Sequence, residues 1–218
     1  LIVVDTPTYW SGFGQGVILL LFQVGGFGIM TTATLFGLMA GRGFGLRDRM
    51  ATQVERSRLE KHDAVAALKL ILTITLIVEG VVAVALALRL FLSYDESFGL
   101  AVWHGLFHSV SAFNNAGFSS YSDSVMGFQN DPLILGPIMF AVILTALGFP
   151  VMQDVRTNGI FWRRWSLHTK VTVAGTAALL VFGFAAILAM EWHNPATLGP
   201  MGWGAKILNA ALAEALAE

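Results

Sequence analysis

The chain has 218 residues, of which 56% are apolar and 12% are charged, whereas soluble domains carry about 25% charged residues. This composition argues against a soluble domain and favours an integral membrane protein. The formal net charge of −1 argues against nucleic-acid binding, and the lack of cysteine excludes disulfides, thiolate metal sites and a cysteine nucleophile. The sequence opens without an initiator Met, and we expect it to be a fragment of a longer protein.

Four apolar runs are each long enough for a membrane-spanning helix, which needs about 20 residues. They cover residues 16–40, 68–92, 132–152 and 171–190. The second run contains a central acid, Glu79, and an acid at membrane depth is either held by hydrogen bonds to a neighbouring helix or lies on an ion pathway. Gly148 and Pro150 predict a kink or an end near the close of the third run, because proline breaks the helical hydrogen-bond ladder.

Basic residues gather on two of the connections and predict the orientation of the spans. The first group is Arg42, Arg47, Arg49, Arg56, Arg58 and Lys61, and the second is Arg156, Arg163, Arg164 and Lys170. The positive-inside rule places both groups in the cytoplasm. They act either as solvated anchors at the lipid surface or as a docking surface for a soluble subunit.

Between the second and third runs, the sequence predicts a short helix over Phe98–Phe113. It cannot cross a hydrocarbon core of about 30 Å at 1.5 Å per residue, and both of its flanks are expected outside. We therefore expect a re-entrant pore helix. Asn114, Asn115, Ala116 and Gly117 follow it, either as an ordinary Asn/Gly turn or as an extended loop that lines water at membrane depth.

A short internal match indicates a repeat. "GGFGIM" at residues 25–30 and "LGFPVM" at residues 147–152 share two apolar residues and a glycine. The predicted organisation is a repeated helix–pore loop–helix unit with four spanning helices and one complete re-entrant loop. Its parts are the end of repeat 1 (1–41), a cytoplasmic loop (42–63), repeat 2 (64–154), a second cytoplasmic loop (155–167) and the start of repeat 3 (168–218).

Several stretches resemble the Trk/Ktr/HKT superfamily of potassium transporters, and most closely the bacterial Ktr membrane subunit. They are "VVDTPTYWSGFGQ", "QVGGFGIMT", "HSVSAFNNAGFS", "GFPVMQD", "LHTK" and "EWHNPATLGP…WGAKILNA", spread over nearly the whole chain. The ending "LAEALAE" departs from the family pattern.

The resemblance implies four repeats around one pore, each with a short selectivity-filter loop centred on glycine. The filter of the second repeat maps onto Asn114, Asn115, Ala116, Gly117 and Phe118, with Glu79 and His108 as candidate pore-supporting residues. The implied function is potassium uptake across the cell inner (plasma) membrane by a multi-pass subunit, with no catalysis and no cofactor, and with sodium as a candidate coupling ion. The implied partners are a second copy, a cytoplasmic nucleotide-binding regulatory subunit (KtrA-like) and membrane lipid.

Two alternatives remain open at this point. An HKT-like, sodium-permeable transporter differs in the filter residue of repeat 1, which would immediately precede Leu1. A membrane metalloenzyme would use His104 and His108, which share a helix face, together with His193. A metal site beyond a monovalent cation would need further ligands at the same depth, and none is evident in the sequence.

Overall fold

The computed structural model describes the backbone of residues 4–40 and 53–217 and the side chains of residues 4–28 and 68–217. Within these ranges the chain is helical without strands, which confirms the predicted all-α class. The α-helices are α1 (Thr6–Tyr9), α2 (Gly12–Ala40), α3 (Gln53–Ser93), α4 (Phe98–Phe113), α5 (Pro132–Ala146), α6 (Phe149–Asn158), α7 (Leu167–Glu191) and α8 (Trp203–Ala215), with short 3-10 helices η2 (Met126–Phe128) and η3 (Trp162–Arg164).

The four apolar runs expected to span the membrane all form helices, but not all of them form one long straight helix. In the described part, Leu68–Ser93 of α3 and the whole of α7 are each long and apolar enough to cross a membrane. Helices α5 and α6 have 15 and 10 residues and pass that test only as a pair, which is bent by 94°. In α2 the stretch with described side chains, Gly12–Gly28, is apolar but shorter than a span. The four expected spans are thus two long helices, one bent pair and one helix whose second half lacks described side chains.

The bend between α5 and α6 confirms the break predicted at Gly148 and Pro150. Gly148 has φ 81° and ψ 158°, a conformation that is essentially restricted to glycine. Pro150 has no N–H to continue the ladder of α5, and α6 instead starts with this proline in its first turn. Gly26, the sequence counterpart of Gly148, lies inside α2. The two matched hexapeptides therefore differ in backbone conformation, because only one contains a proline.

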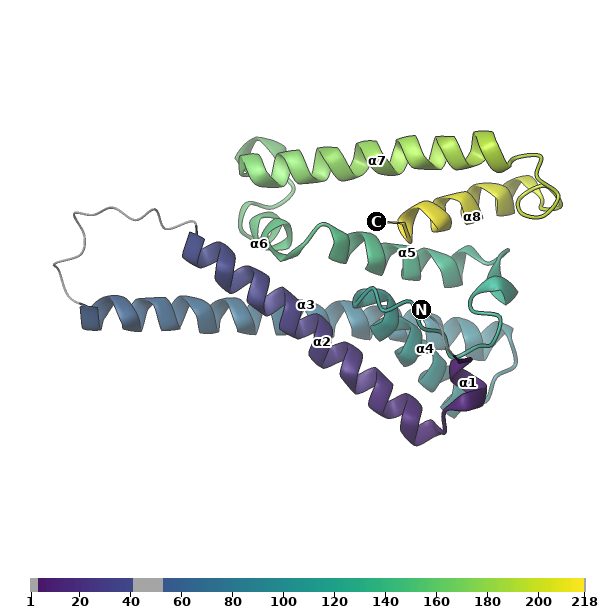
Figure 1. Cartoon of the computed structure of the whole chain (residues 1–218), viewed down its shortest axis with the longest axis horizontal. Coiled ribbons are helices and arrows are strands. Elements are labelled where there is room, and N and C mark those ends of the chain that lie inside the picture. Colours follow the sequence, from purple (N-terminus) through teal and green to yellow (C-terminus); the bar gives the residue numbers. More distant parts are fainter. Residues whose placement is uncertain (1–3, 41–52, 218) are drawn as a thin grey trace.

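The core lies where α3, α4 and α5 pack together, with α2 crossing α3 and α7 running beside α8 (Figure 1). Its buried apolar side chains include Val82, Leu86, Leu90, Ala101, Leu135, Ile138, Ala141 and Val142. Gly105 brings α4 against α3, since a Cβ there would lie 2.7 Å from the carbonyl oxygen of Ala83. Helix α4 is thus seated directly on α3.

The outer faces of α3 and α7 are apolar and exposed. Leu76 and Val81 of α3 are 58% and 63% exposed, and Phe182 of α7 is 76% exposed. Apolar surface of this extent on long helices suits contact with lipid.

Helix α3 begins at Gln53, before the expected start at residue 64, so its first turns belong to the segment predicted as a cytoplasmic loop. Three of the basic residues predicted there, Arg42, Arg47 and Arg49, lie outside the described residues. The side chains of Arg56, Arg58 and Lys61 lie outside the described residues as well.

Candidate functional site

Helix α4 ends at Phe113, as the sequence predicts, and is followed by the loop of residues 114–118, hereafter the NNAGF loop. Its C-terminal half is buried, with Phe107 and Phe113 at 0% and 2% exposure. Asn114 caps the helix, and the chain then turns through positive φ at Asn115 (50°) and Gly117 (71°). Glycine adopts this left-handed conformation without the steric cost that a Cβ brings. The loop therefore leaves the helix axis within a few residues.

One serine of the last turn of α4 holds the NNAGF loop in place. The Ser111 hydroxyl donates to the Phe118 carbonyl at 2.7 Å and accepts from the Phe118 N–H at 3.0 Å. The Ser111 carbonyl accepts from the Ala116 N–H at 2.8 Å. These bonds hold the second half of the loop against the last turn of α4, and no pattern in the sequence had singled out Ser111.

Several N–H groups of the NNAGF loop donate hydrogen bonds, whereas most of its carbonyl oxygens have no donor among the described residues. The carbonyl oxygens of residues 114–117 accept no hydrogen bond from any residue that the structure describes. Asn115 and Gly117 are exposed and Asn114 and Ala116 are half-buried, so these four consecutive oxygens are open to water or to a cation. They are the type of oxygen that replaces the hydration shell of a potassium ion.

The Asn114 side chain lies at the meeting point of α2, α3 and α4. Its Nδ2 donates to the Val110 carbonyl at 2.9 Å and to Glu79 Oε1 at 3.2 Å. The other carboxylate oxygen, Glu79 Oε2, accepts from Gln23 Nε2 at 3.1 Å. Glu79 is only 5% exposed. Of the two interpretations of Glu79, hydrogen bonds to a neighbouring helix are thus present, from Gln23 on α2 and from Asn114 directly after α4.

The remaining side chains of the NNAGF loop contact two further helices. Asn115 Nδ2 donates to Thr145 Oγ1 of α5 at 3.4 Å. The ring of Phe118 packs against Phe22 of α2, with ring centroids 5.0 Å apart. The structure therefore brings Asn114, Asn115 and Phe118 together with α2, α3 and α5. Gln23 was missed, although an amide in an apolar run, two residues before a glycine, is a usable signal.

The side chains of His104 and His108 each form a hydrogen bond with a serine and do not form a metal site with the described residues. His108 is 7% exposed, and its Nδ1 and Nε2 lie 2.9 Å from the His104 carbonyl and 3.0 Å from Ser119 Oγ. His104 Nδ1 lies 2.6 Å from Ser120 Oγ, and both rings stack on Tyr121. Within the described residues no three His, Cys, Asp or Glu side chains gather as a metal site. The pair secures the segment that follows the NNAGF loop.

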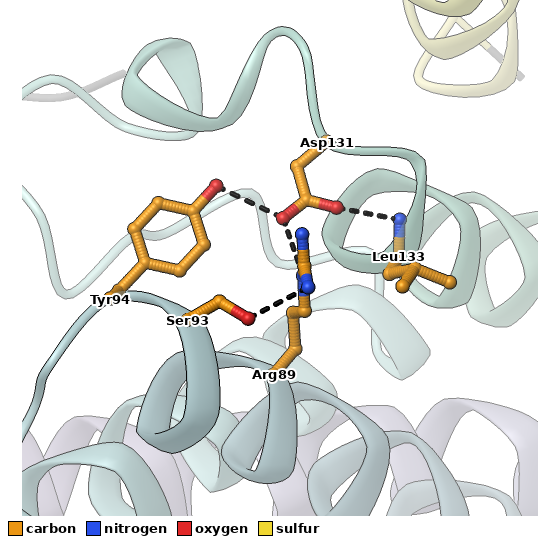
Figure 2. Close-up of polar contacts among 5 residues, drawn as sticks. All are labelled: Arg89, Ser93, Tyr94, Asp131 and Leu133. Atoms are coloured by element: carbon orange, nitrogen blue, oxygen red, sulfur yellow. Dashed lines mark hydrogen bonds and ion pairs between the residues drawn. The ribbon is translucent and has the colours of Figure 1, made fainter.

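A separate polar cluster joins the end of α3 to the start of α5 (Figure 2). Asp131 Oδ2 accepts from Arg89 Nε at 2.8 Å and from Tyr94 Oη at 3.0 Å, and Oδ1 accepts from the Leu133 N–H at 2.9 Å. Burial acts to raise the pKa of Asp131. The hydrogen bonds from Arg89, Leu133 and Tyr94, together with the Arg89 charge, outweigh burial and lower the pKa below its usual value. The cluster thus links the end of α3 to the start of α5, and α4 and the NNAGF loop lie between them in the chain.

Comparison with known proteins finds relatives that are named as uptake proteins for potassium or for potassium and sodium. The relatives include the Ktr system potassium uptake protein B of Bacillus subtilis, 38% identical over 91% of this chain and 44% of that protein. The protein of the same name from Vibrio alginolyticus is 33% identical over 95% of this chain and 46% of that protein. The potassium/sodium uptake protein NtpJ of Enterococcus hirae is 31% identical over 91% of this chain and 43% of that protein. The chain thus spans less than half the length of these curated relatives.

The family match covers most of the chain. Residues 2–188 match the TrkH family, described as a cation transport protein. This family consists of multi-pass proteins of the plasma membrane that are transporters and not enzymes, which removes the metalloenzyme alternative. The apolar helices agree with that location. The match over residues 2–188 shows that the chain belongs to the TrkH family of cation transport proteins.

Proposed function

We propose that the chain is part of the ion-translocating subunit of a potassium uptake system, and that the NNAGF loop is one selectivity filter of its pore. The observation that carries the proposal is the run of carbonyl oxygens at residues 114–117 that accept no hydrogen bond from the described residues. The relatives named as potassium uptake proteins support the choice of ion. In this proposal α4 is a re-entrant pore helix.

The physics of cation binding favours this arrangement. A potassium ion leaves water only where several oxygens replace its hydration shell, and backbone carbonyls supply such oxygens. The C-terminal end of α4 also carries the negative end of the helix dipole, which favours a cation beside the loop. Gly117 allows the left-handed turn that directs the chain away from the helix axis.

The repeat organisation and the partners belong to the same proposal. The full-length protein would enclose one pore with four repeats, of which this chain supplies the end of the first, the second and the start of the third. We propose a dimer in the lipid bilayer that binds a cytoplasmic nucleotide-binding subunit through its basic connections. The naming of two relatives as components of a Ktr system supports a multi-subunit assembly.

Sodium permeation is the second candidate, because one relative is named a potassium/sodium uptake protein. The two candidates differ in the uptake of sodium when potassium is absent, and in whether sodium drives or competes with potassium uptake. A filter glycine in repeat 1, before Leu1, favours potassium, and a serine there favours sodium. Uptake of both ions in one strain separates these outcomes.

The test of the proposed filter is Gly117→Ser in the full-length protein, expressed in cells that lack other potassium uptake systems. A Cβ at Gly117 meets no described atom within 4 Å, so the substitution leaves packing intact and adds backbone strain of about 1 kcal/mol at φ 71°. We expect near-normal membrane expression, about a tenfold loss of apparent potassium affinity and weaker discrimination against sodium.

The matched control is Gly99→Ser, at the exposed start of the same helix, where a Cβ also meets nothing within 4 Å. It should leave potassium affinity and sodium competition unchanged. A Gly117→Ser protein that is expressed normally and keeps both properties would show that the NNAGF loop is not the filter.

A further inference from the structure

Glu79 is a carboxylate buried at membrane depth with amide partners in place of a basic one. Its side chain is 5% exposed, and no described basic side chain forms an ion pair with it. A buried charge without a counter-ion is costly, so it persists where hydrogen bonds satisfy it and where the protein uses it. The two carboxylate oxygens divide their contacts between Gln23 on α2 and Asn114 at the end of α4.

These contacts bind three helices at one point beside the NNAGF loop. Gln23 and Glu79 are 56 positions apart in the chain, and Gln23 and Asn114 are 91 apart. Gln23 Oε1 also lies 3.4 Å from Asn114 Nδ2, so the three side chains form a closed triangle. A second contact joins the same two helices, since the Ser109 hydroxyl of α4 donates to the Glu79 backbone carbonyl of α3 at 2.7 Å.

The backbone of α2 also contacts the second polar atom of the Asn114 amide, its Oδ1. A Cβ placed at Gly26 would collide with Oδ1 of Asn114, so the α2 backbone lies directly against this side chain. Phe22 of the same helix contacts Phe118 at the other end of the loop. The Asn114 amide is therefore held at Nδ2 by Glu79 and Gln23 and confined at Oδ1 by Gly26.

We propose that Glu79 is a positioning residue for ion selection: with Gln23, it holds the Asn114 side chain against Gly26 and thereby sets where the first carbonyl of the NNAGF loop lies. The inference rests on the proposed function, since it assumes that this loop is the filter. Glu79 acts through Asn114 and does not itself touch the ion.

The test uses the full-length protein, with rubidium as tracer for potassium uptake, and measures membrane level, maximal rate, apparent potassium affinity and sodium competition. For Glu79→Gln we expect about a tenfold rise in the potassium concentration for half-maximal uptake and weaker sodium discrimination, at a near-normal membrane level. Ser109→Ala, which removes the other polar contact between α3 and α4, is the matched control. It should lower the membrane level or maximal rate without changing affinity or sodium competition.

Three further variants make the test decisive. The reciprocal exchange Gln23→Glu with Glu79→Gln keeps one carboxylate and one amide in the triangle, and should restore at least half of the lost affinity. Gly26→Ala displaces the Asn114 side chain by contact with its Oδ1 and should reproduce the Glu79→Gln selectivity change. Gly25→Ala, where a Cβ meets nothing within 4 Å, should not.

The outcomes separate the inference from the proposed function. Normal affinity and sodium competition in Glu79→Gln, or equal effects of Gly25→Ala and Gly26→Ala, overturn the positioning role. Failure of every Glu79 variant to reach the membrane assigns a structural role only, which also overturns it. If Gly117→Ser, measured in parallel, changes selectivity while Glu79→Gln does not, only this inference fails. If Gly117→Ser changes nothing, the filter assignment fails.

Discussion

At the scale of single residues, Asp131 shows how one carboxylate ties together the end of one helix and the start of another. It caps α5 through the Leu133 N–H and also binds Arg89 and Tyr94 near the end of α3 (Figure 2). Its side chain is 5% exposed, whereas that of Arg89 is 35% exposed. Loss of Arg89 leaves a buried charge, while loss of Asp131 leaves a cation that can reach water.

We predict that Asp131→Asn lowers the free energy of unfolding in detergent by about 2 kcal/mol at neutral pH, because the ion pair is lost while an amide oxygen retains part of the cap. The pKa of Asp131 is lowered in the folded protein, so its stabilisation is fully present above the unfolded pKa of about 3.9. It is lost as the pH falls from there through the lower folded pKa.

The stability difference between the original protein and Asp131→Asn should therefore be constant from about pH 5 upward and shrink below about pH 4. The measurement is the midpoint of thermal unfolding in detergent between about pH 3 and pH 7 for both proteins. A difference that grows as the pH falls would contradict the lowered pKa.

At the scale of elements, the close approach of α3 and α4 determines where the NNAGF loop begins. A methyl group added at Gly105 would lie 2.7 Å from the Ala83 carbonyl oxygen and 2.8 Å from the Ala87 nitrogen, both backbone atoms of α3. Backbone atoms cannot rotate away as a side chain can. The crossing therefore requires glycine at this position.

Gly105→Ala should lower the free energy of unfolding by about 1–3 kcal/mol, because the added methyl group forces the two helices apart. Gly99→Ala in the same helix meets nothing within 4 Å and should be neutral or slightly stabilising, since alanine favours helix more than glycine. Unfolding midpoints in detergent compare the two variants. Equal midpoints would mean that the helices separate without cost.

At the scale of the whole molecule, the connections gather at opposite ends. The end of α2, the start of α3 and the α6–α7 connection lie toward the left of Figure 1, whereas the α4–α5 and α7–α8 connections lie toward the right. In the sequence, basic residues lie on the connections of the left-hand end, for example Arg156, Arg163 and Arg164 around the α6–α7 connection. The arrangement agrees with the orientation expected from the positive-inside rule.

The orientation is tested with cysteines introduced singly into the full-length protein. Ile160, 85% exposed on the α6–α7 connection, should label only from the cytoplasm once replaced by cysteine. Met126, 70% exposed in η2, should label from outside intact cells after the same replacement. The chain itself contributes no competing cysteine. Labelling of the Ile160 position from outside would reverse the topology and with it the cytoplasmic docking proposal.

The sequence alone determined those features that depend on neighbouring residues. Apolar runs marked α3 and α7, the helix over Phe98–Phe113 was predicted with both ends correct, and the break at Gly148 and Pro150 follows from the missing N–H of proline. The position of Asn114 to Gly117 after that helix, and the need for glycine at φ 71°, were local signals too.

The tertiary structure alone decided how the candidate site is held. The Gln23–Glu79–Asn114 triangle joins residues 35 to 91 positions apart, and Asp131 meets Arg89 across 42 positions. Such contacts depend on how each helix is rotated about its axis and where two helices cross, and close packing settles both over the entire interface. No local pattern records those rotations, so Glu79 was a lone acid in the sequence and became a partner of the NNAGF loop only once α2, α3 and α4 were packed together.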